Sequence, residues 1–561
     1  MAIIKVNTKK LSLWIAGSVA FLLIISFFFL NGFLEGVVKE YLGREIVRIN
    51  ESKHYNLTIS DIRLNILRGN LSLIEMSALP TKEHAKLFED GASDELVLKE
   101  LMVSQADIEG LSIFNFLWDK DLDIRAFTVD NIIFNLYHNA WTKELKGIEK
   151  KKKSSFSLDS LRLPGLTSVN LSKITVENYQ FNIIDKSIQD TLSSYMGDEL
   201  IFSGIALKPT NKESPFFKID DSKLELDLKK QVYNLSGGKY FISFDNFNFS
   251  TETGLLSLKN FGFKPQASRA VFASQNTYTY EIFDLEISEF DIHGVNTSTF
   301  IANGAISMDS ISIDSMGLQI FKDKTKPLNT AKHKLLPNEQ LKNINQPLHI
   351  KHIRVSNSHL KYSELLPKNQ KMLQFELKDI NADIDYITSV RDSMQTERTL
   401  AIELRANLQG AIALDVKLGM PYGTDNNAFS FSGSTKETAS FKELNSIISP
   451  VLGIRFTGGR LNGMEFNGRG TPHSINGDLA MYYKDLEIQI ENKKDKEKKG
   501  VNWLANSMVK SSNPNKKGKL IIGSMNYERE YYKGLPNYLW KSIQTGVVNS
   551  FNPVGNRKKK K

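Results

Sequence analysis

Residues 127–136 read FTVDNIIFNL, and two later stretches, ITVENYQFNI at 174–183 and IRVSNSHLKY at 353–362, follow the same pattern. In each copy, apolar and polar residues alternate on both sides of a central asparagine: Asn131, Asn178 and Asn357. Alternation with a period of two is typical of a β-strand with one buried face. Asparagine tolerates the left-handed backbone that a kink needs. We therefore interpret each copy as strand, Asn-centred turn or bulge, strand.

The pattern extends beyond these three copies. A looser one, with Ser315 in place of asparagine, covers Ile311 to Ile320, and alternating runs recur from Tyr55 through Val416. Any β-meander can produce such a pattern by chance. If the repetition is genuine, it favours an elongated stack of similar units over a globule. In either case the body of the chain is predicted to be mainly β, with a few short helices.

The apolar side of such strands must be covered, because a sheet cannot leave hundreds of Å² of apolar surface in water. Two sheets can close on one another as a sandwich. Alternatively, one long sheet can curl into a groove whose apolar interior is filled by something else, such as alkyl chains. The residues alone leave both open. Alternation places six candidates on the inside of a lipid groove: Val129, Phe134, Leu136, Val176, Phe181 and Ile183.

The N-terminal region contains a candidate membrane anchor. Leu11 to Leu34 carries no formal charge, and as a helix it would be roughly 36 Å long against a hydrocarbon core of ~30 Å. It is too long and too poor in small residues at its end for a cleaved signal peptide. Lys5, Lys9 and Lys10 precede it, which places the N-terminus in the cytoplasm. Its apolar side chains include Leu13, Trp14, Phe21, Leu22 and Phe28.

The domain organisation predicted from these patterns has five parts. They are a cytoplasmic N-terminus (1–10), a transmembrane signal anchor (11–34), a helical neck (35–53), a β-rich groove outside the cytoplasm (54–491) and a C-terminal strand and helix cap with a basic tail (492–561). The C-terminal helix is expected at Leu535 to Phe551. It would either cap the end of the sheet or lie at a membrane interface through Trp540 and Lys541.

Composition excludes several function classes. The chain has no cysteine, so it has neither disulfides nor thiolate metal sites. Much of its net charge of +9 is concentrated in local lysine runs, which argues against a nucleic-acid-binding face. His349 and His352 are the only closely spaced histidines, and on a strand they would point to opposite faces. No catalytic motif is present, so we expect neither an enzyme nor a cofactor.

The basic C-terminus consists of Arg557, Lys558, Lys559, Lys560 and Lys561. It could contact anionic lipid head groups at ~1 kcal/mol per charge. A solvated tail is the simpler alternative.

Both ends of the chain resemble the AsmA-like proteins of Gram-negative bacteria. Near the N-terminus the resemblance rests on the anchor, the neck, LTISDIR at 57–63 and IEGLSIF at 108–114. Near the C-terminus it rests on FTGGRLN at 456–462 and GDLAMYYKDLEI at 477–488. The middle of the chain, roughly 190–345, shows no such similarity.

This resemblance implies an inner-membrane protein with a single N-terminal span and a periplasmic β-groove, related to bridge-like lipid transfer proteins. It favours the groove over the sandwich. The expected function is to shield and convey phospholipid acyl chains for outer-membrane lipid homeostasis. The alternative is an envelope scaffold that assists assembly of outer-membrane or secreted proteins through its sheet edges. The expected partners are therefore the membrane, phospholipid acyl chains and other envelope proteins, with no nucleic acid.

Overall fold

A computed structural model describes residues 55–65, 68–89, 96–138, 161–185, 190–220, 223–490 and 510–551, with shorter gaps inside these ranges, and also Ile46, Val47 and Asn50. The chain forms two compact units, Met1–Gly262 (unit 1) and Phe263–Lys561 (unit 2). The sequence patterns do not predict a boundary at this place. Each unit is described by itself.

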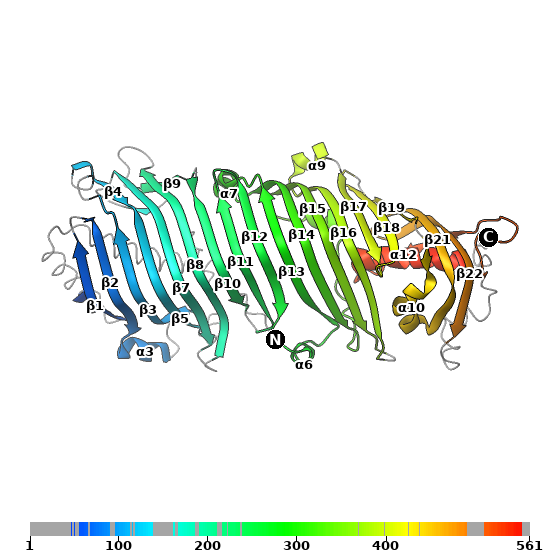
Figure 1. The fold of residues 1–561 in the computed structure, drawn as a ribbon, viewed down its shortest axis with the longest axis horizontal. Helices are drawn as coiled ribbons and strands as arrows, with labels where there is room; N and C mark the ends of the chain where they lie inside the picture. The colour runs from blue at the N-terminus through cyan, green and yellow to red at the C-terminus, as the bar shows by residue number, and fades with distance from the viewer. Residues whose placement is uncertain are drawn as a thin grey trace. The chain divides into compact units, whose positions relative to one another are not determined.

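Unit 1 consists almost entirely of strands. Strands β1, β2, β3 and β5 pair antiparallel in succession, β5 pairs parallel with β7, and β7, β8, β10 and β11 are again antiparallel. Figure 1 shows these strands side by side. The elements are β1 (Tyr55–Asn65), β2 (Asn70–Pro80), α3 (Lys82–Glu89), β3 (Leu96–Glu109), β4 (Asp121–Ile124), β5 (Ala126–His138), β6 (Leu161–Arg162), β7 (Ser168–Asp185), β8 (Asp190–Pro209), β9 (Phe216–Asp220), β10 (Glu225–Asn234), β11 (Tyr240–Ser250) and β12 (Leu255–Pro265).

Unit 2 has the same character, with more short helices. Strands β13 and β14 are antiparallel, β14 and β15 are parallel, and β15 to β19, β21 and β22 follow as antiparallel neighbours. Its elements are α6 (Arg269–Ser274), β13 (Tyr280–His293), α7 (Thr297–Asn303), β14 (Ile306–Asp323), α8 (Pro337–Lys342), β15 (Leu348–Leu365), β16 (Met372–Thr388), α9 (Arg391–Glu397), β17 (Thr399–Leu408), β18 (Ile412–Pro421), β19 (Phe429–Thr435), β20 (Ala439–Ser440), the 3-10 helix η4 (Phe441–Leu444), α10 (Asn445–Leu452), β21 (Ile454–Gly470), β22 (Ser474–Ile490), β23 (Ile522–Ser524), β24 (Tyr527–Glu528) and α12 (Leu535–Phe551).

The prediction of a mainly β chain with few short helices is confirmed. Within each unit, the described strands belong to one meandering sheet, in which each strand pairs with its neighbours. No second sheet lies on the apolar side of this sheet among the described residues of either unit. The apolar side must therefore be covered in another way or remain open.

The kinks predicted at the repeat asparagines are confirmed. Asn131, Asn178 and Asn357 have φ angles of 51°, 50° and 50°, and Ser315, in the looser copy, has a φ of 55°. These are left-handed conformations, which most residues avoid. Each kink lies inside one continuous strand, so it is a local bend and not a turn between two strands.

Neighbouring strands kink at the same level, which preserves their register. Val129 faces Val176 before the kink, and Phe134 faces Phe181 after it. Because each strand contains one extra residue at the kink, the alternation shifts by one and the apolar side chains return to the same face. The aligned kinks therefore bend the sheet without interrupting its apolar side.

The two parallel strand pairs share one hydrogen-bond arrangement around an aspartate. In unit 1, Asp130 accepts from Asn131 Nδ2 (2.8 Å) and, with its other oxygen, from Asn178 Nδ2 (3.0 Å). In unit 2, Asp314 accepts from Ser315 Oγ (2.8 Å) and Asn357 Nδ2 (2.8 Å) in the same way. The equivalent contacts in two places indicate that the repetition in the sequence reflects a repeated structural unit.

Valine at a kink should destabilise the fold. We expect Asn178→Val to lower the free energy of unfolding by about 1–2 kcal/mol, because a β-branched residue is strained at a positive φ. Asn178→Gly is the matched control, since glycine adopts this conformation freely. Chemical denaturation of the purified chain measures both. Equal unfolding midpoints for the valine and glycine variants would contradict a strained left-handed position.

Helix α12 spans Leu535–Phe551 as the sequence predicts, and it packs on the last strands of unit 2. Tyr538 is 1% exposed, and its ring lies edge-on to Phe429 with 6.2 Å between centroids. The helix backbone approaches β23 so closely that a Cβ on Gly523 would lie 1.9 Å from the carbonyl oxygen of Gly546. Packing this close requires glycine and fixes the helix firmly against the sheet.

No helix among the described residues is long and apolar enough to cross a membrane. The predicted span at 11–34, the N-terminus before it and most of the neck lie outside the described residues.

Candidate functional site

The site with the clearest functional character is one side of the sheet in unit 2, which we call the apolar face. Paired residues of neighbouring strands share a face, so the register identifies its members. Its rows run from strand to strand with almost no polar interruption: Phe283, Leu285, Ile287, Phe290 and Ile292 on β13; Ile311, Ile313, Met316, Leu318 and Ile320 on β14; Ile353, Val355, Leu360 and Tyr362 on β15; and Phe375, Leu377, Ala382 and Ile384 on β16.

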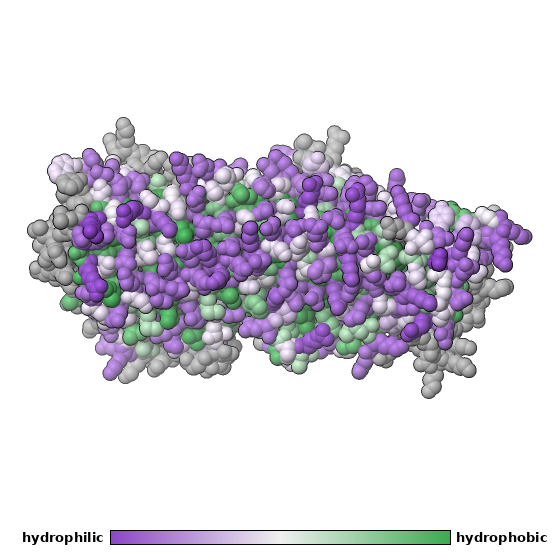
Figure 2. Space-filling model, viewed as in Figure 1, coloured by the Kyte–Doolittle hydropathy of each residue, from purple (hydrophilic) through white to green (hydrophobic). Residues whose placement is uncertain are grey.

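The opposite side of the same strands is mostly polar, with an apolar exception where Ile282 on β13 faces Phe321 on β14. Arg354 pairs with Asp383 (3.1 Å) and Lys417 pairs with Glu403 (2.7 Å) across neighbouring strands. Figure 2 shows that the side turned towards the viewer is mostly hydrophilic over β14 to β17. These exposed ion pairs contribute little to stability. They define which side of the sheet faces water.

Burial of the apolar face changes along unit 2. On β13 to β15 most of its side chains are only half-buried, with exceptions at the level of the kinks such as Ile287 and Val355. Further along, the same side is covered by α12 and belongs to a core with Leu418, Phe431 and Leu479. The apolar face is therefore closed at its C-terminal end and uncovered, among the described residues, over β13 to β15.

Unit 1 shows the reverse order. Its first strands, β1 to β7, form a buried core on the apolar side of the sheet of unit 1. Beyond β7, the apolar side chains are again half-buried: Tyr195, Leu200 and Phe202 on β8, Leu226, Leu228 and Tyr233 on β10, and Ile242, Phe247 and Phe249 on β11. Each unit therefore has one closed region and one partly open apolar region.

A polar cluster interrupts the apolar side of unit 1. Gln231 is fully buried and accepts hydrogen bonds from the hydroxyls of Tyr179 and Tyr233. Its amide nitrogen donates to the carbonyl oxygens of Lys229 (2.8 Å) and Glu199 (3.2 Å). The cluster satisfies its own hydrogen bonds, so it costs little stability. It divides the apolar side of unit 1 at the level of the kinks.

Buried tyrosines give the fold a predictable response to alkali. Burial raises the pKa of Tyr233 and the pKa of Tyr483 from 10 to about 12. Because these two pKa values are higher in the folded than in the unfolded state, protonation of the two tyrosines favours the folded state. This contribution to the free energy of unfolding is fully present below pH ~10 and is lost as pH rises towards 12. Ultraviolet titration of the 18 tyrosines should show a subset that ionises late or only on unfolding. Titration of all tyrosines together near pH 10 in a folded protein would contradict this.

The six groove candidates named from the sequence lie together on one side of β5 and β7. They face one another in three pairs: Val129 with Val176, Phe134 with Phe181, and Leu136 with Ile183. Phe181 is partly buried, and the other five are between 1% and 6% exposed. The structure thus places them on the expected side of the sheet, but in the closed region of unit 1.

The other residues singled out in the sequence are not part of the apolar face. The anchor residues Leu13, Trp14, Phe21, Leu22 and Phe28 and the tail from Arg557 to Lys561 lie outside the described residues. On α12, Trp540 is 41% exposed.

The structure gives no metal site to the histidine pair. His352 contacts Asp385 (2.7 Å) and Asp383 (3.2 Å) on the polar side of β15. Among the described residues, no group of three or more metal-binding side chains could hold a metal ion.

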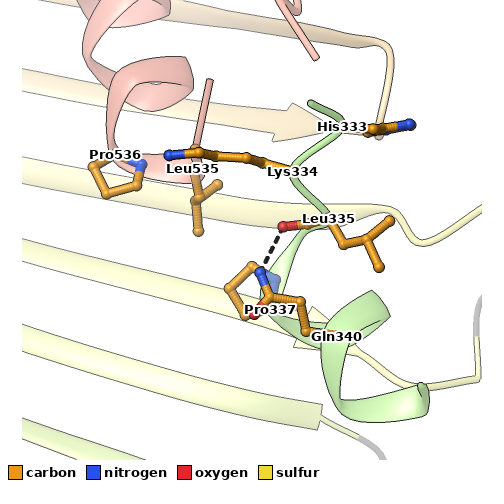
Figure 3. Close-up of a pocket in the computed structure, with 8 residues that line it drawn as sticks. His333, Lys334, Leu335, Pro337, Gln340, Leu535 and Pro536 are labelled. Carbon is orange, nitrogen blue, oxygen red and sulfur yellow. Dashed lines mark hydrogen bonds between the residues drawn. The ribbon is translucent and has the colours of Figure 1, made fainter. Parts of the chain in front are cut away.

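A surface pocket lies between the loop before α8 and the beginning of α12 (Figure 3). Its lining combines Leu335, Pro337, Leu535 and Pro536 with the exposed His333 and Lys334. Gln340 closes one side by donating to the carbonyl oxygen of Leu335 (2.8 Å). This pocket lies beside the start of α12 and has no lining residue in common with the apolar face.

Sequence reasoning missed the most open part of the candidate site. The half-buried residues of β13 and β14 alternate in the same way as the six named candidates, so the pattern was present. Alternation identifies a face but does not show how deeply that face is buried.

The chain matches no protein-family model and no curated protein sequence.

Proposed function

We propose that the protein holds phospholipid acyl chains on its apolar face. The observation that supports this most directly is the uncovered run of apolar rows on β13 to β15, backed by a polar side with exposed ion pairs. An uncovered apolar surface of this extent marks a binding surface for an apolar partner.

The dimensions suit an acyl chain. The three strands β13 to β15, about 4.8 Å apart, give a width of roughly 10 Å, and the rows from Phe283 to Ile292 extend about 30 Å along the strand. The hydrocarbon layer of one membrane leaflet is about 15 Å deep, half of the ~30 Å core, so an acyl chain fits along the rows. The surface can therefore shield a whole acyl chain from water.

In this proposal, the span at 11–34 anchors the chain in a bacterial inner membrane, and the β body lies in the periplasm. It conveys phospholipid for outer-membrane lipid homeostasis, as the resemblance to AsmA-like proteins implies. In this role the protein shields the acyl chains from water and does not catalyse a reaction. The closed regions at β1 to β7 and under α12 confine bound chains to the open region of each unit.

Native mass spectrometry of the full chain purified from its own membranes tests the proposal. We expect bound phospholipid that survives extensive washing. A folded chain without lipid would contradict it. A protein partner bound to the same face would favour the alternative of an envelope scaffold.

A further inference from the structure

The edge of unit 2 at which β13 begins and β14 ends is built from α6 and the loop that follows β14. Helix α6 lies beyond the strand ends, at the lower edge in Figure 1. Its Phe272 is 3% exposed and stacks on Tyr280 with 6.4 Å between the ring centroids. The ammonium of Lys326, in the loop, donates to the carbonyl oxygens of Ala273 and Asn276 at the end of α6. Helix and loop therefore form one surface.

Three large hydrophobic side chains of this surface face solvent. Val271 on α6 is 39% exposed, Tyr278 is 47% exposed and Leu328 is 40% exposed. The backbone N–H of Thr279 donates to the carbonyl oxygen of Pro327 (2.9 Å). Tyr278 and Leu328 are the chain neighbours of this bonded pair, and Val271 lies on the helix that the same loop caps. The three side chains thus form one exposed apolar patch.

The exposed charge of this surface is positive. Neither the segment 265–280 nor the segment 324–338 contains an acidic residue. Arg269 is exposed, and its guanidinium lies over the ring of Phe321, 4.0 Å from the centroid. Lys332 is exposed and follows Leu328 by four residues, so the chain keeps the two within about 14 Å of each other. Among the residues that the structure describes, neither Arg269 nor Lys332 forms an ion pair with a carboxylate.

The carboxylates at this end of β13 to β15 do not offset that charge. Glu281 forms an ion pair with Lys322, and Glu364 forms one with Lys324. Asp323 is 8% exposed and already accepts hydrogen bonds from its neighbours. Arg269 and Lys332 therefore remain available to an anionic partner.

Hydrophobic side chains next to free cations suit the interface of an anionic bilayer. Tyrosine and aliphatic side chains enter the head-group layer, and lysine and arginine are attracted to anionic head groups. The position of the surface fits as well. The apolar rows of β13 and β14 begin at Phe283 and Ile320, each three residues from this end of its strand. A bilayer docked here would lie at the end of the open rows.

We propose that α6 and the loop after β14 dock onto an anionic bilayer, and that phospholipid reaches the apolar face from this edge. The second part rests on the function proposed above. The docking surface consists of Arg269, Val271, Tyr278, Leu328 and Lys332. Its three hydrophobic side chains enter the head-group layer, and its two cations bind lipid phosphates. Acyl chains then pass from the bilayer onto the rows of β13 and β14.

Vesicle binding by the full chain tests the docking surface. The chain is held in a nanodisc of phosphatidylcholine, and its binding to vesicles with or without phosphatidylglycerol is measured by flotation. The unmodified chain should bind only the vesicles that contain phosphatidylglycerol, and salt should weaken this binding. Lys332→Glu should weaken it about tenfold, because one charge near the anionic surface changes sign. Tyr278→Ser combined with Leu328→Ser should weaken it at every salt concentration.

The matched control is Lys351→Glu, which changes the net charge of the chain by the same amount. Lys351 is exposed near the beginning of β15, and β14 and β15 are parallel, so it lies at the opposite end of the strands. This variant should bind vesicles like the unmodified chain. Equal binding by the Lys332→Glu and Lys351→Glu variants would overturn the docking surface. So would an unmodified chain that does not bind vesicles containing phosphatidylglycerol.

Phospholipid carried by the same purified chain, quantified by mass spectrometry, separates docking from the proposed function. A chain that carries phospholipid but does not bind vesicles would overturn docking alone. Vesicle binding that depends on Lys332, in a chain that carries no phospholipid, would overturn the proposed function and the route of lipid entry. A photoreactive amino acid in place of Tyr278 should give lipid adducts in intact cells. An adduct with an acidic protein instead would overturn the assignment to a bilayer.

Discussion

Leu318→Asp is expected to reduce the phospholipid that co-purifies with the protein by tenfold or more. Leu318 lies in the middle of the apolar face, between Leu285 and Leu360 on the neighbouring strands. An acyl chain covering this position would trap an unpaired carboxylate in an apolar medium, which costs several kcal/mol. A loss of only about 1.4 kcal/mol already lowers binding tenfold.

The neighbouring residue on the same strand provides the control. Gln319 is exposed on the polar side, so Gln319→Asp introduces the same charge without touching bound lipid. Leu318→Asn, which adds a polar group without charge, should have an intermediate effect. Quantitative lipid mass spectrometry, together with unfolding midpoints, measures all three variants. Equal lipid content in the Leu318→Asp and Gln319→Asp variants, with both folded, would show that the apolar face does not hold lipid.

Val176→Asp should have a different and equally large effect, because it should unfold unit 1. Val176 is 6% exposed and lies between Val129 and Leu200. A carboxylate there would lose the buried apolar contacts and leave an unpaired charge in the core, at a cost of several kcal/mol. We expect a large fall in the unfolding midpoint of the purified chain, or failure to obtain folded protein.

Ser172→Asp is the matched control on the same strand, since Ser172 is exposed. It should leave the unfolding midpoint within the range of ordinary surface substitutions. The two carboxylates thus compare a buried position with an exposed position of the same strand. Similar stability of the two variants would mean that the side of β7 bearing Val176 is open and not packed.

The strand kinks show what the sequence could predict. Spacing and residue type predict kinks at Asn131, Asn178 and Asn357, and all three adopt a left-handed backbone. The bounds of α12 followed from its apolar spacing in the same way. These features depend on local geometry, which residue type and periodicity determine directly.

The depth of burial could not be predicted in this way. Val176 and Leu318 occupy similar alternating patterns, yet Val176 is in a core and Leu318 is only half-buried. The difference depends on what covers each strand, including α12 in unit 2, which is distant in sequence.

Site-specific photocrosslinking in intact cells tests the central claim most directly. A photoreactive amino acid replaces Leu285, Leu318 or Leu360 on the apolar face, and Gln319 or Lys417 on the polar side, in cells grown with labelled lipid precursors. The account predicts labelled phospholipid adducts at the three leucine positions and none at the two polar positions. Protein adducts without lipid at the leucine positions, or equal lipid labelling on both sides of the sheet, would contradict it.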